Sequence, residues 1–209
     1  MKAQTKETQN SYSPQSAIDA LKEGNQRFLA TKQANRDLLE QVTDTSGGQY
    51  PFAVVLSCID SRVPAEIVFD QGIGDIFSAR VAGNIVNEDI LGSIEYGCKV
   101  AGSKAVVVLG HTACGAVKGA CDDVQLGNIT PLLSKIKPAV NAVTEPSNQD
   151  ERNSSNKTFV NDVVYKNVRM TIDNMRNDSE VLNEMEGNNE IKIVGAVYDV
   201  ASGKVEFLD

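Results

Sequence analysis

The sequence predicts an α/β fold in which a mostly parallel β-sheet is flanked by helices. Three short apolar runs, at 52–57, 76–81 and 105–109, have the length and composition of buried strands. Segments in which apolar residues recur at helical spacing lie between them and after them. This alternation is typical of parallel strands that are joined by helical crossovers and covered on both faces.

An N-terminal helical arm is expected before the first strand. Ser13 suits the N-cap of a helix and Pro14 suits its first turn, and an apolar stripe continues to about Thr31. The polar segment 32–50 is expected to cross the surface, with a short helix near 37–42.

The rest of the chain supplies further helices and a final hairpin. Helices are predicted at 64–69, 88–101, 114–120, 130–143 and 159–177. Pro138 is a candidate kink in one of them. Two apolar runs, at 191–198 and 204–208, predict a hairpin at the end of the sequence.

Length and composition indicate one globular domain. The 209 residues are expected to form a single domain, with the arm at 1–50 and an α/β core at 51–209. A net charge of −8 with scattered Lys and Arg argues against nucleic-acid binding. There is no apolar run of about 18 residues that would span a membrane, and the polar start lacks the apolar core of a secretory signal. A cytoplasmic protein without a membrane partner is therefore expected.

Two clusters of chemically active side chains follow predicted strands. Cys58, Asp60 and Arg62 occupy alternate positions directly after the first strand, and His111 and Cys114 follow the third. His111 is the only histidine of the chain. Open parallel sheets place their sites at the carboxyl ends of strands, so the two clusters are expected to meet there.

The residue types favour a catalytic zinc site. Two thiolates, one imidazole and one carboxylate form a plausible tetrahedral set for zinc. An arginine two residues from the carboxylate could compete with the metal for it, which favours catalysis over a purely structural role. Extended backbone would turn Cys58, Asp60 and Arg62 to one cleft with Ile59 packed behind them.

Local backbone geometry supports the second cluster. His111 and Cys114 are three residues apart, a spacing that places them on one face of a helical turn. A helix N-terminus favours the thiolate form of Cys114. Gly110 and Gly115 are expected to let the backbone approach the metal closely.

The other two cysteines are expected to be structural. Cys98 and Cys121 have no partner at ligand spacing and are interpreted as small buried apolar residues. Four cysteines are too few for a disulfide-stapled domain, which agrees with a reducing compartment.

The two motifs resemble the signatures of β-class carbonic anhydrases. The motifs are those at 58–62 and 110–115, and the likeness extends to segments at 75–84, 94–96 and 195–199, so that it covers roughly residues 15–208. The resemblance implies a mostly parallel sheet with helices. It also implies a homodimer or tetramer whose active sites lie at the subunit interface.

The resemblance implies a lyase. The expected reaction is the reversible hydration of carbon dioxide to bicarbonate and a proton by a zinc-hydroxide mechanism. The zinc ligands implied are Cys58, His111 and Cys114. Asp60 and Arg62 would form a catalytic dyad, and Asp60 could instead become the fourth zinc ligand in a closed form. Gln71 is a candidate contact for bicarbonate.

Two other functions fit the same residues. Some proteins with this ligand set hydrolyse carbon disulfide or carbonyl sulfide, and motifs cannot separate them from carbonic anhydrases. A non-catalytic zinc-binding or redox-sensing module is the second alternative, and it would tolerate Asp60→Asn. A purely structural zinc site is disfavoured because such sites usually have four Cys or His ligands, and only three are available here.

Overall fold

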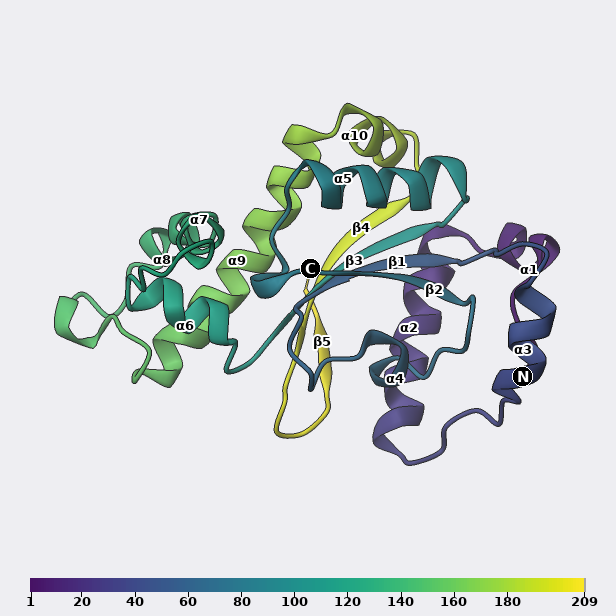
Figure 1. Ribbon diagram of the computed structural model, residues 1–209, viewed down its shortest axis with the longest axis horizontal. Coiled ribbons are helices and arrows are strands. Elements are labelled where there is room, and N and C mark those ends of the chain that lie inside the picture. Colours follow the sequence, from purple (N-terminus) through teal and green to yellow (C-terminus); the bar gives the residue numbers. More distant parts are fainter. Residues whose placement is uncertain (209) are drawn as a thin grey trace.

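The structure, a computed structural model, describes residues 1–208 and is built around a five-stranded sheet (Figure 1). The strand order is β2-β1-β3-β4-β5. The strands are β1 (Ala53–Ser57), β2 (Ile76–Arg80), β3 (Ala105–His111), β4 (Lys192–Tyr198) and β5 (Val205–Phe207). The first four strands are parallel, and β5 pairs with β4 in the antiparallel sense. The predicted fold class and the C-terminal hairpin are confirmed.

Helices cover both faces of the sheet (Figure 1). The α-helices of the described residues are α1 (Lys6–Ser11), α2 (Pro14–Leu29), α3 (Leu38–Thr45), α4 (Ala65–Val68), α5 (Glu88–Glu95), α6 (Gly115–Cys121), α7 (Ile129–Ser134), α8 (Lys137–Ala142), α9 (Lys157–Asp178) and α10 (Glu180–Gly187). Shorter turns are the 3₁₀ segments η1 (Ala82–Asn84) and η3 (Gln149–Glu151) and the π-helical segment η2 (Tyr96–Val100). One core lies under α2 and α4, and the other lies under α5, α6, α9 and α10.

The two cores explain the uninterrupted apolar strands. Successive side chains of a strand point to opposite faces. Leu56 and Val108 therefore belong to the core on the α9 side of the sheet, whereas Val55 and Val107 belong to the core on the α2 side, and all four are fully buried. A strand that is buried on both faces has no polar positions, which is the pattern that the sequence displays.

The N-terminal arm begins as predicted. Ser13 caps α2 by accepting a hydrogen bond from the Ser16 N–H, and Pro14 occupies the first turn. Asp37 caps α3, which confirms a helix in this region although it extends to Thr45. Helix α1 was not predicted, because its six residues are all polar and so give no apolar stripe.

Two helical predictions need correction. The segment 130–143 is two helices, α7 and α8, which are separated at Lys135 and Ile136; Pro138 lies in the first turn of α8, where its missing N–H has no helical acceptor, and it produces no kink. The helix predicted at 88–101 is α-helical only to Glu95 and continues as the π-helical segment η2. Helix α10 was not predicted.

No helix in the described part of the chain combines the length and the apolar character that a crossing of the bilayer requires.

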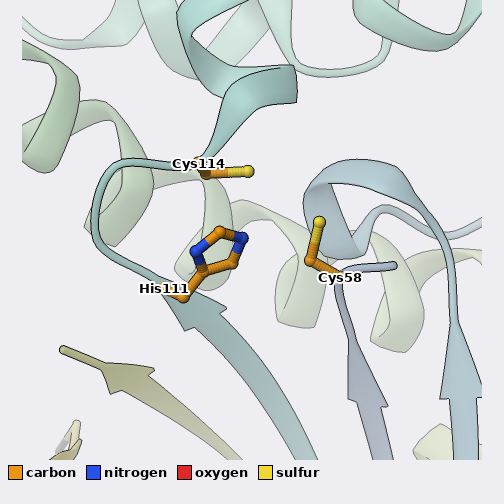
Figure 2. Close-up of side chains that lie close together, drawn as sticks. All are labelled: Cys58, His111 and Cys114. Carbon is orange, nitrogen blue, oxygen red and sulfur yellow. The ribbon is translucent and has the colours of Figure 1, made fainter. Parts of the chain in front are cut away.

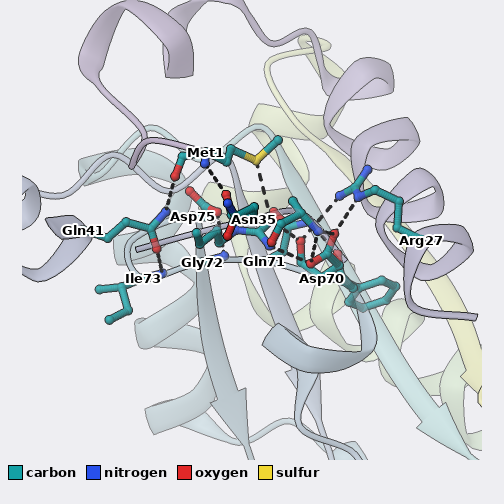
Figure 3. Close-up of polar contacts among 12 residues, drawn as sticks. Met1, Arg27, Asn35, Gln41, Asp70, Gln71, Gly72, Ile73 and Asp75 are labelled. Atoms are coloured by element: carbon teal, nitrogen blue, oxygen red, sulfur yellow. Dashed lines mark hydrogen bonds and ion pairs between the residues drawn. The ribbon is translucent and has the colours of Figure 1, made fainter. Parts of the chain in front are cut away.

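A buried carboxylate joins the arm to the core (Figure 3). The side chain of Asp70 is 2% exposed and accepts hydrogen bonds from Arg27 Nε at 2.5 Å and Arg36 Nη1 at 2.6 Å. The Ala34 N–H donates to the same carboxylate at 3.1 Å. Burial acts to raise the pKa of Asp70, but these donors outweigh it, so the pKa lies below its ordinary value. Asp70 therefore stays ionised and holds two segments of the arm against the end of α4.

Replacing Asp70 with Asn should lower the free energy of unfolding by about 3 kcal/mol at neutral pH, because two arginines would be left without their counter-charge. The pKa of Asp70 is lower in the folded chain than in the unfolded chain. Its contribution is therefore present at neutral pH and is lost as the pH falls below about 4 towards the folded pKa. Urea denaturation of D70N and the wild type at several pH values would measure both effects. The exposed Asp44 provides the control D44N, and an equal loss in both variants would contradict the assignment.

Candidate metal centre

Two parallel strands bring the two sequence clusters together. Ser57, at the end of β1, lies opposite Leu109 of β3, so Cys58 follows β1 beside the end of β3, where His111 is the last residue. Cys114 is the N-cap of α6 after a short turn. The three side chains converge (Figure 2), and their ligand atoms all lie within 4.8 Å of one another.

The His111 imidazole has the hydrogen bonding expected of a metal ligand. His111 is fully buried, and its Nδ1 lies 3.0 Å from the Thr112 carbonyl oxygen, which places the proton on Nδ1. Among residues 1–208, no hydrogen-bond partner reaches His111 Nε2. An unpaired buried nitrogen costs about 1–3 kcal/mol. A metal ion held between this nitrogen and the two sulfur atoms would remove that cost, so the residues fit a metal.

The pKa values of the two thiols depend on each other. The hydrogen bond with Cys114 lowers the pKa of Cys58 to about 4, and the Gly83 N–H also donates to Cys58 Sγ at 3.4 Å. The same hydrogen bond and burial raise the pKa of Cys114. These directions favour the thiolate form of Cys58, and binding of a cation would release the proton that Cys114 holds.

A carboxylate–guanidinium pair lies beside the three ligands. Arg62 donates from Nε to Asp60 Oδ1 at 2.9 Å and from Nη2 to Asp60 Oδ2 at 2.7 Å. These hydrogen bonds hold the pKa of Asp60 well below its usual range. Asp60 Oδ2 lies 3.8 Å from His111 Nε2. The carboxylate thus reaches the centre while both of its oxygens stay bonded to Arg62.

The backbone route to this arrangement differs from the prediction. The chain turns at Asp60, whose carbonyl accepts from the Val63 N–H, and Ile59 is 63% exposed rather than packed behind the cluster. His111 lies in a strand and Cys114 precedes a helix, so the two do not share a helical face. Ala113 between them has φ of 57°, the left-handed turn that brings Cys114 back towards the imidazole.

The expected role of the glycines is also corrected. A Cβ on Gly110 would lie 2.6 Å from Val168 Cγ2, so this glycine permits the close packing of α9 on β3. A Cβ on Gly115 would meet no atom within 4 Å. Neither glycine is explained by an approach of the backbone to the metal.

Three other residues considered in the sequence are Gln71, Cys98 and Cys121, and none of them joins the cluster of three metal-facing side chains. The Gln71 amide donates to the Phe69 carbonyl at 2.6 Å, in the region of Asp70 (Figure 3), and is not brought to the three ligands. Its assignment as a bicarbonate contact stays a prediction. Cys98 and Cys121 are buried free thiols in the apolar core, as predicted.

Sequence reasoning missed the residues that hold the ligand loops. Arg80, at the end of β2, donates from Nε to the Cys58 carbonyl at 3.0 Å and from Nη2 to the Asp60 carbonyl at 2.7 Å. On the other side, the Thr112 hydroxyl bonds Asp199 after β4 at 3.3 Å. An arginine at a strand end is a detectable signal, but its acceptors are carbonyls that no sequence pattern reveals.

Comparison with known proteins gives the family. A family model described as carbonic anhydrase matches residues 53–205. Carbonic anhydrase 2 of Mycobacterium tuberculosis is 34% identical over 197 residues, which cover 94% of this chain and 93% of that protein. One of two tetrameric β-carbonic anhydrases of Sordaria macrospora matches with a TM-score of 0.69 at 25% identity, over 80% of this chain and 85% of that one. The chain belongs to the β-carbonic anhydrase family.

Further relatives agree in sequence and in fold. A carbonic anhydrase of Mycolicibacterium smegmatis is 36% identical over 199 residues, with 92% of each chain covered. The β-carbonic anhydrase CafA of Aspergillus fumigatus has the same fold, with a TM-score of 0.71 at 23% identity over 93% of this chain and 90% of that one. The family relation therefore covers the arm as well as the sheet.

Cobalt(II) titration should test the metal centre directly. The wild type is expected to develop sulfur-to-cobalt charge-transfer absorption, because two thiolates face the site. Cys114→Ser should weaken this absorption and bind the ion more weakly. Cys121→Ser removes a buried thiol outside the cluster and is the matched control. Equal titrations of the two variants would count against the assigned ligands.

Proposed function

We propose that the protein catalyses the zinc-dependent, reversible hydration of carbon dioxide to bicarbonate and a proton. The observation that carries the proposal is the convergence of Cys58, His111 and Cys114 beside the Asp60–Arg62 pair in a member of this family. Zinc suits two sulfur ligands and one nitrogen ligand, and three protein ligands leave a fourth position open, as in catalytic sites.

The bound ion would acidify water and so supply a nucleophile near neutral pH. The residues of the chain determine where that water lies. Asp60 is ionised and can only accept hydrogen bonds, so it would orient a donor O–H beside His111. Arg62 bonds both carboxylate oxygens, which would favour the open form over the closed form in which Asp60 is the fourth ligand. In this arrangement Asp60 and Arg62 act as a catalytic dyad.

Asp60→Asn should lower the rate of hydration about 100-fold, since the amide can donate to water and would misplace it. Zinc content should stay at the wild-type level because the three ligands remain. Stopped-flow hydration with an indicator dye would measure the rate, and elemental analysis would measure the zinc. The exposed carboxylate of Asp44 provides the control D44N.

Wild-type rates for D60N would overturn the role of the dyad. Stoichiometric zinc without hydration in the wild type would overturn the function itself. Assays with carbonyl sulfide and carbon disulfide on the same preparation would then separate a sulfur-substrate hydrolase from a non-catalytic module.

We also propose that the protein assembles through the β2 edge of its sheet. β2 is an outer strand, and α4 and α5 pack against it. Exposed apolar side chains gather on α4 and on η2, which continues α5; they include Ile67 (59% exposed) on α4, and Tyr96 (52%) and Val100 (70%) on η2. Tyr96 packs edge-on against Phe77 of β2, with ring centroids 6.3 Å apart. An unpaired strand edge with apolar flanks fits a second copy of this chain, and the exposed Arg62 would place the dyad near that interface.

Light scattering should give the wild type a mass that is a multiple of the 22.5 kDa chain. A charged side chain would be desolvated at the interface, so Val100→Asp should shift the mass towards the monomer. Leu126, which is 63% exposed near α7, provides the control L126D. A monomeric wild type, or unchanged assembly of V100D, would exclude this surface.

The proposed location is the cytoplasm. All four cysteines are free thiols in the structure, including the pair whose sulfur atoms face each other at the metal centre. Their free state supports a reducing compartment.

A further inference from the structure

We propose that Asn167 of α9 is a positioning residue for the metal centre, which acts by fixing the Gly83 turn that donates to the Cys58 sulfur. The inference rests on the proposed metal centre. Asn167 lies in α9, the helix that packs against β3 and β4.

A continuous chain of hydrogen bonds links α9 to the ligand. Asn167 is 3% exposed, and its Nδ2 donates to the Gly83 carbonyl oxygen at 2.8 Å. The N–H of the same glycine donates to Cys58 Sγ at 3.4 Å. Both hydrogen bonds are buried. Asn167 is therefore one residue removed from a metal ligand, although 109 positions separate it from Cys58 in the sequence.

The Gly83 turn can serve this purpose because it has little freedom. Gly83 has φ of 72°, and a Cβ there would lie 2.5 Å from Ile136 Cδ1, so only glycine fits. The turn is closed by the Asn84 N–H, which donates to the Val81 carbonyl at 2.9 Å. The Gly83 carbonyl is left without a backbone partner in this turn, and Asn167 supplies the donor that it needs.

Loss of the Asn167 donor would weaken the hydrogen bond from the Gly83 N–H to Cys58 Sγ. A buried carbonyl without a partner costs about 1–3 kcal/mol, and a movement of the whole turn that relieved this cost would also displace the Gly83 N–H from Cys58. A peptide N–H on a thiolate holds the direction of its lone pairs and spreads its charge, and removal of such outer partners weakens metal binding about 10–100-fold. A purely structural asparagine would affect the melting temperature without changing the bound metal.

Two variants of Asn167 separate these roles. N167D replaces the donor with an acceptor that repels the Gly83 carbonyl, and N167L keeps a similar volume without any donor. The control is N174D, an exposed asparagine two turns further along α9. Zinc affinity would be measured by competition with a chromophoric chelator, and thiolate bonding by the charge-transfer absorption of the cobalt(II) form. Both Asn167 variants should bind zinc about 10–100-fold more weakly and shift the cobalt absorption, whereas N174D should match the wild type.

Folded Asn167 variants with wild-type zinc affinity and an unshifted cobalt spectrum would overturn the proposal, even if their melting temperature fell. If neither variant folds, ¹¹³Cd-loaded wild-type protein decides. A scalar coupling between the Gly83 amide proton and cadmium, through Cys58 Sγ, supports the proposal, and its absence overturns it. All of these readouts report metal binding, so a wild type that binds metal but does not hydrate carbon dioxide would refute the proposed function and leave this inference standing.

Discussion

Three buried electron-pair donors converge at one point of the fold, where the ends of β1 and β3 meet the start of α6. Cys58, His111 and Cys114 are almost wholly inaccessible to water, and within the described residues the His111 Nε2 has no partner. The Gly83 N–H donates to the Cys58 sulfur, and the two thiols lie close enough to shift each other's pKa. A divalent cation that accepts sulfur and nitrogen would satisfy all three at once, and its binding free energy would add to the stability of the strand ends that present these side chains.

The parallel sheet makes that convergence possible. Pairing of β1 with β3 sets Cys58 beside the end of the strand that carries His111, so two ligands come from a rigid framework. The third comes from the first residue before α6, which a left-handed Ala113 turns inward. Gly110 lets α9 lie directly against β3. Helix α9, which covers this core, therefore also lies close to the metal centre. Its Asn167 donates to Gly83, whose N–H in turn donates to Cys58 Sγ.

Sequence patterns predicted the elements whose signals are local. Buried strands have uniform apolar composition, and Ser13 and Asp37 mark helix starts through caps made within three residues. The convergence of Cys58, His111 and Cys114 was predictable because these residues follow two strands that end together. The direction of Ile59 was not, since it depends on a turn closed by Asp60. The partners of Arg80 and Asp70 could not be predicted either, because these hydrogen bonds join segments that only the folded chain brings together.

The three metal-facing side chains are buried, whereas the Asp60–Arg62 dyad is more accessible to water. This difference limits the routes by which a proton could leave the site in the proposed reaction. Arg62 is half exposed and keeps Asp60 ionised far below neutral pH, so Asp60 can orient a donor but cannot carry a proton away. His111 is the only histidine of the chain, and its free nitrogen faces the metal centre. No imidazole remains to relay protons. The proton released with bicarbonate would therefore leave without a histidine relay, and the exposure of the Arg62 side chain places the dyad where water can reach it.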